Sequence, residues 1–159
     1  MINKKRILAI DPGNIESAYV LLDKESYNPI EFDKSYNDKV IEKINCYDFD
    51  VLIVEMIASY GLAVGKSVFD TCVWIGRFIQ EAQKRGIPFE LIYRKEEKMN
   101  LCHSMKAKDT NIRQALIDRF GEVGTKTKPG FFYGFKKDIW SAFAVGVTYL
   151  DKIGGKYVE

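Results

Sequence analysis

An apolar run that stops abruptly on an acidic residue is the feature that most restricts how this chain can fold. Residues 7–10 read Ile-Leu-Ala-Ile, and Asp11 follows them directly, with a Pro-Gly turn after it. A second apolar run, residues 51–54, ends on Glu55 in the same way. Both runs have the length and composition of buried strands. The sequence therefore predicts two core strands that each end on a carboxylate.

A third acid begins an apolar helical stretch near the end of the chain. Asp138 precedes residues 139–144, which read Ile-Trp-Ser-Ala-Phe-Ala. Taken alone, Asp11 fits a turn, Glu55 a strand that reaches solvent, and Asp138 a favourable charge at a helix start. Together, three carboxylates at the edges of three core elements are how a fold gathers oxygen ligands for a hard divalent cation such as Mg2+.

The length and composition fit one soluble domain, which we expect to span residues 1–159. The chain has 159 residues, of which 47% are hydrophobic, enough for one proper core. Asp11 interrupts the first apolar run too early for a signal peptide, and no run approaches the ~20 apolar residues that span a bilayer. Three widely spaced cysteines form neither a disulfide framework nor a zinc pattern. We expect a cytoplasmic protein with no membrane association.

Positive charge is concentrated in one part of the chain. The net charge is only +2, but residues 94–137 contain eleven Lys and Arg against five Asp and Glu. A basic segment on a nearly neutral protein indicates a phosphate-rich partner, although a solvated surface without a partner would give the same count.

The order of the expected elements predicts the fold class. Three strands come first, and then helices and strands alternate, with the unbroken run at 51–56 typical of a strand covered on both faces. This order favours an α/β, ribonuclease H-like fold with a mixed five-stranded sheet and helices on both faces. Asp109 or Thr110 can cap a helix that Gly121 closes. The expected elements are strands 6–11, 16–23, 29–35, 51–56 and 88–93, and helices 37–47, 66–85, 109–120 and 138–151, with a loop at 121–136.

The helix at 66–85 is apolar over more than one face. Val68, Cys72, Ile75, Ile79 and Ala82 follow one stripe, and four larger apolar residues widen it. Such a helix is either deeply buried or part of an oligomer interface. The widening residues are Phe69, Val73, Trp74 and Phe78.

Several other site types are excluded. Residues 61–67 resemble a phosphate-binding P-loop but have three residues between the glycines where that loop needs four, and Tyr60 stands where the first glycine belongs. His103 is the only histidine and has no nearby partner for a metal site. Actin-like kinases share the Asp-x-Gly turn, but this chain is too short for their two domains.

In this order, the motifs around Asp11, Glu55 and Asp138 resemble those of the RuvC Holliday-junction resolvases over essentially the whole chain. The small, lysine-rich form is similar to versions carried by phages of Gram-positive bacteria. The resemblance implies a homodimer that nicks four-way DNA symmetrically in recombination, repair or phage DNA processing. It also implies dependence on Mg2+, with Mn2+ able to substitute, and no organic cofactor.

The resemblance assigns roles to individual residues. Asp11, Glu55 and Asp138 match the metal-binding acids, whereas Ser141 falls on the position of a fourth acid and brings no charge. Lys95 and Lys108 match the family's lysines, and Lys108 is assigned to catalysis together with the acids and Ser141. The residues expected to contact DNA are Tyr60, which can stack on an unpaired base, and Lys66, Lys95, Lys98, Lys106, Lys108, Lys136 and Lys137.

Two other functions remain open at this point. An RNA-directed nuclease of the same fold, of the ribonuclease H or ribosomal-RNA maturation type, would carry the same acids but has less need of an apolar dimer helix. Because the fourth acid is missing, a dimer that binds junctions without cutting them is also compatible with the sequence.

Overall fold

The strand that ends on Asp11 lies at the centre of the sheet. The computed structural model, which describes residues 5–156, pairs β1 (Arg6–Asp11) antiparallel with β2 (Glu16–Asp23) and parallel with β4 (Val51–Met56). β3 (Pro29–Tyr36) and β5 (Phe89–Tyr93) complete the order β3-β2-β1-β4-β5. The mixed five-stranded sheet predicted from the sequence is confirmed, with strand ends that agree to within one residue.

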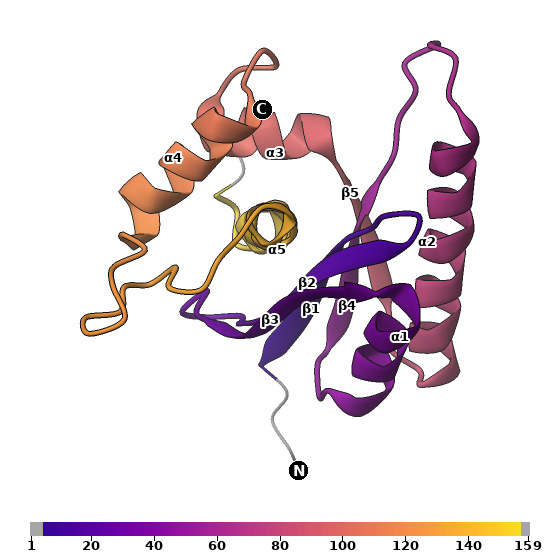
Figure 1. The fold of residues 1–159 in the computed structure, drawn as a ribbon, viewed down its shortest axis with the longest axis horizontal. Coiled ribbons are helices and arrows are strands. Elements are labelled where there is room, and N and C mark those ends of the chain that lie inside the picture. The colour runs from indigo at the N-terminus through magenta and orange to yellow at the C-terminus, as the bar shows by residue number, and fades with distance from the viewer. Residues whose placement is uncertain (1–4, 157–159) are drawn as a thin grey trace.

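Helices cover both faces of this sheet (Figure 1). α1 (Asn37–Cys46) and α2 (Lys66–Lys84) pack on one face. α5 (Asp138–Ile153) packs on the other, and α3 (Arg94–Cys102) and α4 (Asp109–Phe120) lie beyond it (Figure 1). Within residues 5–156, no helix is long and apolar enough to cross a membrane.

Alternate residues of β1 belong to two separate cores. Ile7 and Ala9 pack in the cluster that contains α5, whereas Leu8 and Ile10 pack in the cluster that contains α1 and α2. All four are fully buried. Asp11 is therefore the point at which a strand covered on both faces first reaches open space.

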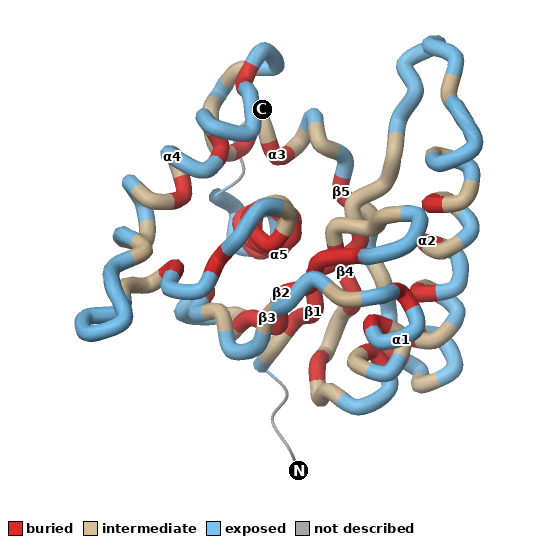
Figure 2. Tube along the Cα trace, in the orientation of Figure 1, coloured by how far each residue is buried: buried red, intermediate tan, exposed pale blue. Residues whose placement is uncertain are grey.

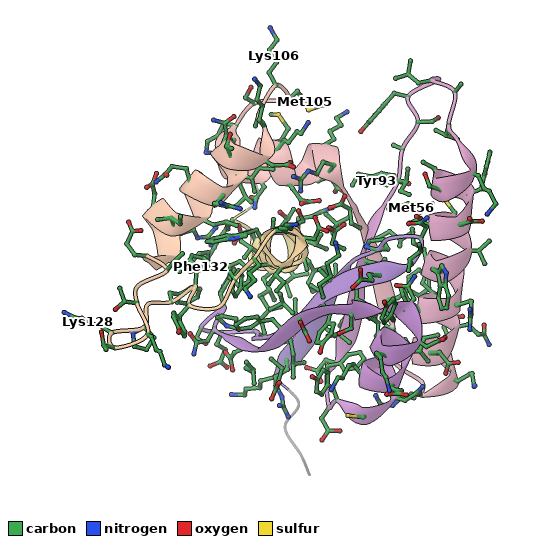
Figure 3. The ribbon with its side chains drawn as sticks, in the orientation of Figure 1. Met56, Tyr93, Met105, Lys106, Lys128 and Phe132 are labelled. Carbon is green, nitrogen blue, oxygen red and sulfur yellow. The ribbon has the colours of Figure 1, made fainter. Side chains whose placement is uncertain are left out.

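α5 lies unusually close to the sheet, and its middle turns are buried on every side (Figure 2). A Cβ added at Gly146 would lie 2.9 Å from Leu22 Cδ2 and 3.2 Å from Ala9 Cβ. Phe132, from the loop after α4, packs against the same helix (Figure 3). This close packing fixes the start of α5, and with it Asp138, relative to β1.

Two details differ from the sequence predictions. The buried stripe of α2 consists of Thr71, Ile75, Phe78 and Ala82, so it is rotated from the stripe we expected, because the larger Phe78 takes the central place. α4 begins at Asp109 itself, with Lys108 as its N-cap, so neither Asp109 nor Thr110 caps it.

α3 is absent from the predicted elements. Its two buried residues are Glu97 and Asn100, which are polar, so apolar periodicity could not reveal the helix. The helix begins where the Tyr93 N–H donates to Glu96 Oε2 at 2.8 Å.

Candidate active site

The turn after β1 holds Asp11 in a fixed position. Ser17 Oγ accepts a hydrogen bond from the Gly13 N–H at 3.0 Å and donates to Asn37 Oδ1 at 2.6 Å. The Asn37 amide donates in turn to the Gly13 carbonyl at 2.9 Å. A Cβ at position 13 would lie 2.2 Å from the Glu16 carbonyl oxygen, so only glycine fits this turn.

The fold brings Asp11, Glu55 and Asp138 together. Ile10 pairs with Val54, so the next residues, Asp11 and Glu55, stand at adjacent ends of parallel strands. Asp138 is the first residue of α5, which packs on β1. Burial, together with the negative charges of Glu55 and Asp138, raises the pKa of Asp11 to about 8.

Two hollows meet at Asp138. One, of about 470 Å³, is lined by Asp11, the turn that follows it and Lys34. The other, of about 330 Å³, is lined by Lys137, Ser141 and Arg94 among other residues. Ser141 therefore shares a hollow with Asp138, as their spacing of three residues on one helix predicts.

Two cations that the sequence analysis missed approach the acids. Lys34 Nζ lies 2.7 Å from Asp138 Oδ2, and Arg94 Nη1 lies 3.8 Å from Glu55 Oε2. The hairpin register could have indicated Lys34, because Asp11 pairs with Ala18 and Ala18 pairs with Lys34 in one row across the sheet. Lys34 lies outside the basic segment, and so the charge count did not point to it.

A fourth acid, Glu97 on α3, is also present and was not predicted. Its side chain is fully buried, and Arg94 Nη1 donates to its Oε1 at 2.9 Å. Burial and the neighbouring charge of Glu55 raise the pKa of Glu97 well above its usual value. Within residues 5–156, Glu55 Oε2 and Glu97 Oε2 are both buried without a hydrogen-bond partner.

The carboxylate oxygens of these acids are suitable ligands for a hard divalent cation, although the acids are not grouped around one point. In the part of the chain that the structure describes, no three acidic, His or Cys side chains form a ready-made metal cluster. Asp138 is turned toward Lys34, and Glu55 lies beside Arg94. Mg2+ prefers oxygen ligands, and the buried Glu55 Oε2, which has no hydrogen-bond partner in the described residues, is one such oxygen. A metal bound through Asp138 Oδ2 would therefore compete with the ion pair to Lys34.

The predicted lysines lie on several different elements, and of these Lys137 lines a hollow of the site. Lys108 is exposed at the N-cap of α4, and the next residue, Asp109, lines the smaller hollow. Lys66 pairs with Asp70 at 2.6 Å at the start of α2. Lys106 projects outward from the connection between α3 and α4 (Figure 3). The remaining predicted lysines are Lys95 and Lys98 on α3, and Lys136 and Lys137 just before α5.

Apolar side chains are exposed on the connection from β4 to α2 and along α2. Tyr60 is 68% exposed, and Leu62, two residues later, is 74% exposed. Phe69 and Val73 on α2 are 61% and 63% exposed. Figure 2 shows this connection and the outer side of α2 as largely exposed. The helix expected to be either buried or an interface is therefore only half covered by its own sheet.

Comparisons with known proteins agree on the fold. No protein-family model and no curated protein sequence matches the chain. Solved structures do match: Thermus thermophilus RuvC has a TM-score of 0.72 and 13% identity over 95% of this chain and 97% of that one. The yeast mitochondrial Holliday junction resolvase gives 0.62 and 12% over 94% and 81%.

A third match is a complex with DNA. The Fowlpox virus resolvase, solved with substrate Holliday junction DNA, has a TM-score of 0.53 and 15% identity over 92% of this chain and 99% of that one. At these identities the likeness establishes the fold, and the predicted ribonuclease H-like architecture is confirmed.

Proposed function

We propose that this chain is a metal-dependent endonuclease of the RuvC type that nicks four-way DNA junctions. The observation that carries the proposal is the meeting of Asp11, Glu55 and Asp138 at one edge of the sheet. The fold that brings them together is that of proteins solved as Holliday junction resolvases, two of them in complex with junction substrate.

The acids would hold Mg2+ or Mn2+, with Asp11 at the centre and Glu55 and Asp138 beside it. Such an ion supplies activation of water and charge relief at the phosphate during phosphodiester hydrolysis. Asp11 must lose a proton before it can bind a cation, because its pKa is raised to about 8. Lys34 keeps Asp138 paired until a cation displaces it.

The surroundings of the acids suit a DNA backbone. Lys137 and Arg113 line the same hollow as Asp138, and Lys95, Lys108 and Lys136 are exposed on neighbouring elements. Such contacts position the phosphates without reading base sequence. Tyr60, exposed on the connection after β4, is suited to stacking on an unpaired base, an interaction worth ~1–3 kcal/mol.

The exposed apolar side of α2 supports a homodimer. Phe69 and Val73 stand one turn apart and are both more than half exposed. Two subunits related by two-fold symmetry would each present one set of acids, as two opposed nicks require.

A second candidate function is a dimer that binds junctions without cutting them. Ser141 brings no carboxylate to the smaller hollow, and residues 5–156 contain no ready-made metal cluster. This candidate predicts tight junction binding that is unaffected by Mg2+ and gives no products.

Incubation with three substrates separates these functions. Purified protein should cut a four-way DNA junction in Mg2+ or Mn2+, spare linear duplex, and leave all DNA intact in EDTA. Asp11→Asn should bind the junction without cutting it, whereas Glu31→Gln, an exposed change on β3, should cut normally. Preferred cutting of an RNA–DNA hybrid would instead support the RNA-directed nuclease, and binding without cutting by the wild type would support the second candidate.

A further inference from the structure

Arg94 lies among the acids of the site, and its side chain is only 25% exposed. It is the first residue of α3 and directly follows β5, the neighbour of β4, the strand that carries Glu55. Its guanidinium lies 3.8 Å from Glu55 and also contacts Asp109. Arg94 and Asp138 line the same hollow of about 330 Å³. The guanidinium is therefore a cation placed inside the site.

Glu97 holds this guanidinium in place. Its carboxylate is 0% exposed and accepts from Arg94 Nη1 at 2.9 Å, one helical turn away on α3. A buried carboxylate that accepts a hydrogen bond from a partly buried arginine fixes its orientation more strongly than an exposed partner could. Glu97 thus holds the Arg94 guanidinium at a position where it also lies near Glu55.

Fixed cations already lie beside the acids of the site. Lys34 Nζ lies 2.7 Å from Asp138 Oδ2, and the Arg94 guanidinium lies beside Glu55 and Glu97. The negative charge that attracts divalent ions is therefore partly offset before any ion binds. Ser141 lines the same hollow as Asp138 but adds no charge there, whereas a carboxylate at position 141 would help to hold a second ion.

We propose that Arg94 is a fixed cation of the reaction site that takes the place of a second divalent ion, so that each subunit binds a single Mg2+. The inference deepens the proposed nuclease function and rests on it. Arg94 provides permanent positive charge toward a phosphate in the hollow of Asp138 and Ser141, and Glu97 is the residue that positions it. A guanidinium also donates hydrogen bonds to phosphate oxygens in a planar, paired geometry.

Counting bound Mn2+ by anomalous X-ray diffraction tests this proposal without DNA or activity. Crystals of the wild type soaked in saturating MnCl2 should show one anomalous peak per site, and so should Ser141→Asp, because Arg94 still excludes a second ion. The double variant Arg94→Gln/Ser141→Asp should show two peaks. The matched control Arg113→Gln/Ser141→Asp, which removes another arginine from the same hollow, should show one.

The result for the wild type is decisive even if a variant fails to fold. Two peaks in the wild type would overturn the proposal, and so would a single peak in a folded Arg94→Gln/Ser141→Asp variant. If loss of Arg94 leaves Glu97 too unfavourable for folding, the triple variant with Glu97→Gln removes that buried charge and carries the same expectation of two peaks. A protein that binds one ion but cuts no junction would contradict the nuclease function alone, whereas one that cuts junctions with two ions would contradict only the role of Arg94.

Discussion

Replacing Asp11 by Asn should stabilise the metal-free protein at pH 8 and have little effect at pH 4. The pKa of Asp11 is raised from 3.8 to about 8 by burial and by the charges of Glu55 and Asp138. Because the folded state holds this proton more tightly than the unfolded state, the contribution of Asp11 to stability is fully present below about pH 4 and is lost as pH rises toward 8. Asn has the same shape and does not titrate.

The size of the effect follows from the pKa difference. Each pKa unit corresponds to about 1.4 kcal/mol, so a rise of roughly 4 units sets an upper bound of about 6 kcal/mol at pH 8. Asp11 is only partly buried and lines a hollow, so solvent lowers this bound, and we expect about 2 kcal/mol. For a chain of this length, that corresponds to a rise in melting temperature of roughly 4–8 °C.

Thermal unfolding followed by circular dichroism in EDTA, from pH 4 to pH 8.5, measures this directly. The difference in melting temperature between Asp11→Asn and the wild type should widen steadily with pH. Glu31→Gln, which neutralises an exposed acid on β3, should track the wild type throughout. Added Mg2+ should then stabilise the wild type but not Asp11→Asn. Parallel curves for the wild type and Asp11→Asn at all pH values would refute the electrostatic description of the site.

Four further changes test other parts of the account. Ser141→Asp should lower the Mg2+ concentration for half-maximal cutting. If that concentration is unchanged, Ser141 does not lie near the metal. Lys34→Met should tighten Mg2+ binding in calorimetry several-fold, because it frees Asp138 from an ion pair at 2.7 Å; weaker binding would contradict that competition. Gly146→Ala should destabilise the fold by about 1–3 kcal/mol in urea unfolding, because its Cβ would meet the sheet at 2.9 Å. Val73→Glu should convert a dimer to monomer in sedimentation, and a monomeric wild type would argue against α2 as the interface.

The sequence was sufficient to predict the architecture and the meeting of Asp11, Glu55 and Asp138 at one edge of the sheet. Asp11 and Glu55 each follow an unbroken apolar run. Such runs can be recognised in the sequence because both faces of β1 and β4 are buried, so that every position in them is apolar. Asp138 was recognisable because the helix that follows it is apolar on nearly every side. Strong local patterns thus identified the residues at the edges of the core.

The cations and the fourth acid depend on tertiary contacts that no local pattern records. Lys34 reaches Asp138 across 104 positions of sequence, through the pairing of β3 with β2. Glu97 and Arg94 belong to a short helix whose buried side is polar, so its periodicity resembled a solvated surface. From the charge count alone, every cation of residues 94–137 could lie on the surface. In the structure, Arg94 and Arg119 instead pair with the buried acids Glu97 and Asp151.

Mapping nicks on a four-way junction shows whether the site of Asp11, Glu55 and Asp138 cuts branched DNA. Each strand is labelled in turn, and products are resolved on sequencing gels with Mg2+ for the wild type and for Asp11→Asn. The account predicts paired nicks at equivalent positions on two opposed strands for the wild type and none for Asp11→Asn, with equal junction binding by both. Nicks that persist at the same positions in Asp11→Asn, or a wild type that binds the junction and leaves every strand intact, would contradict it.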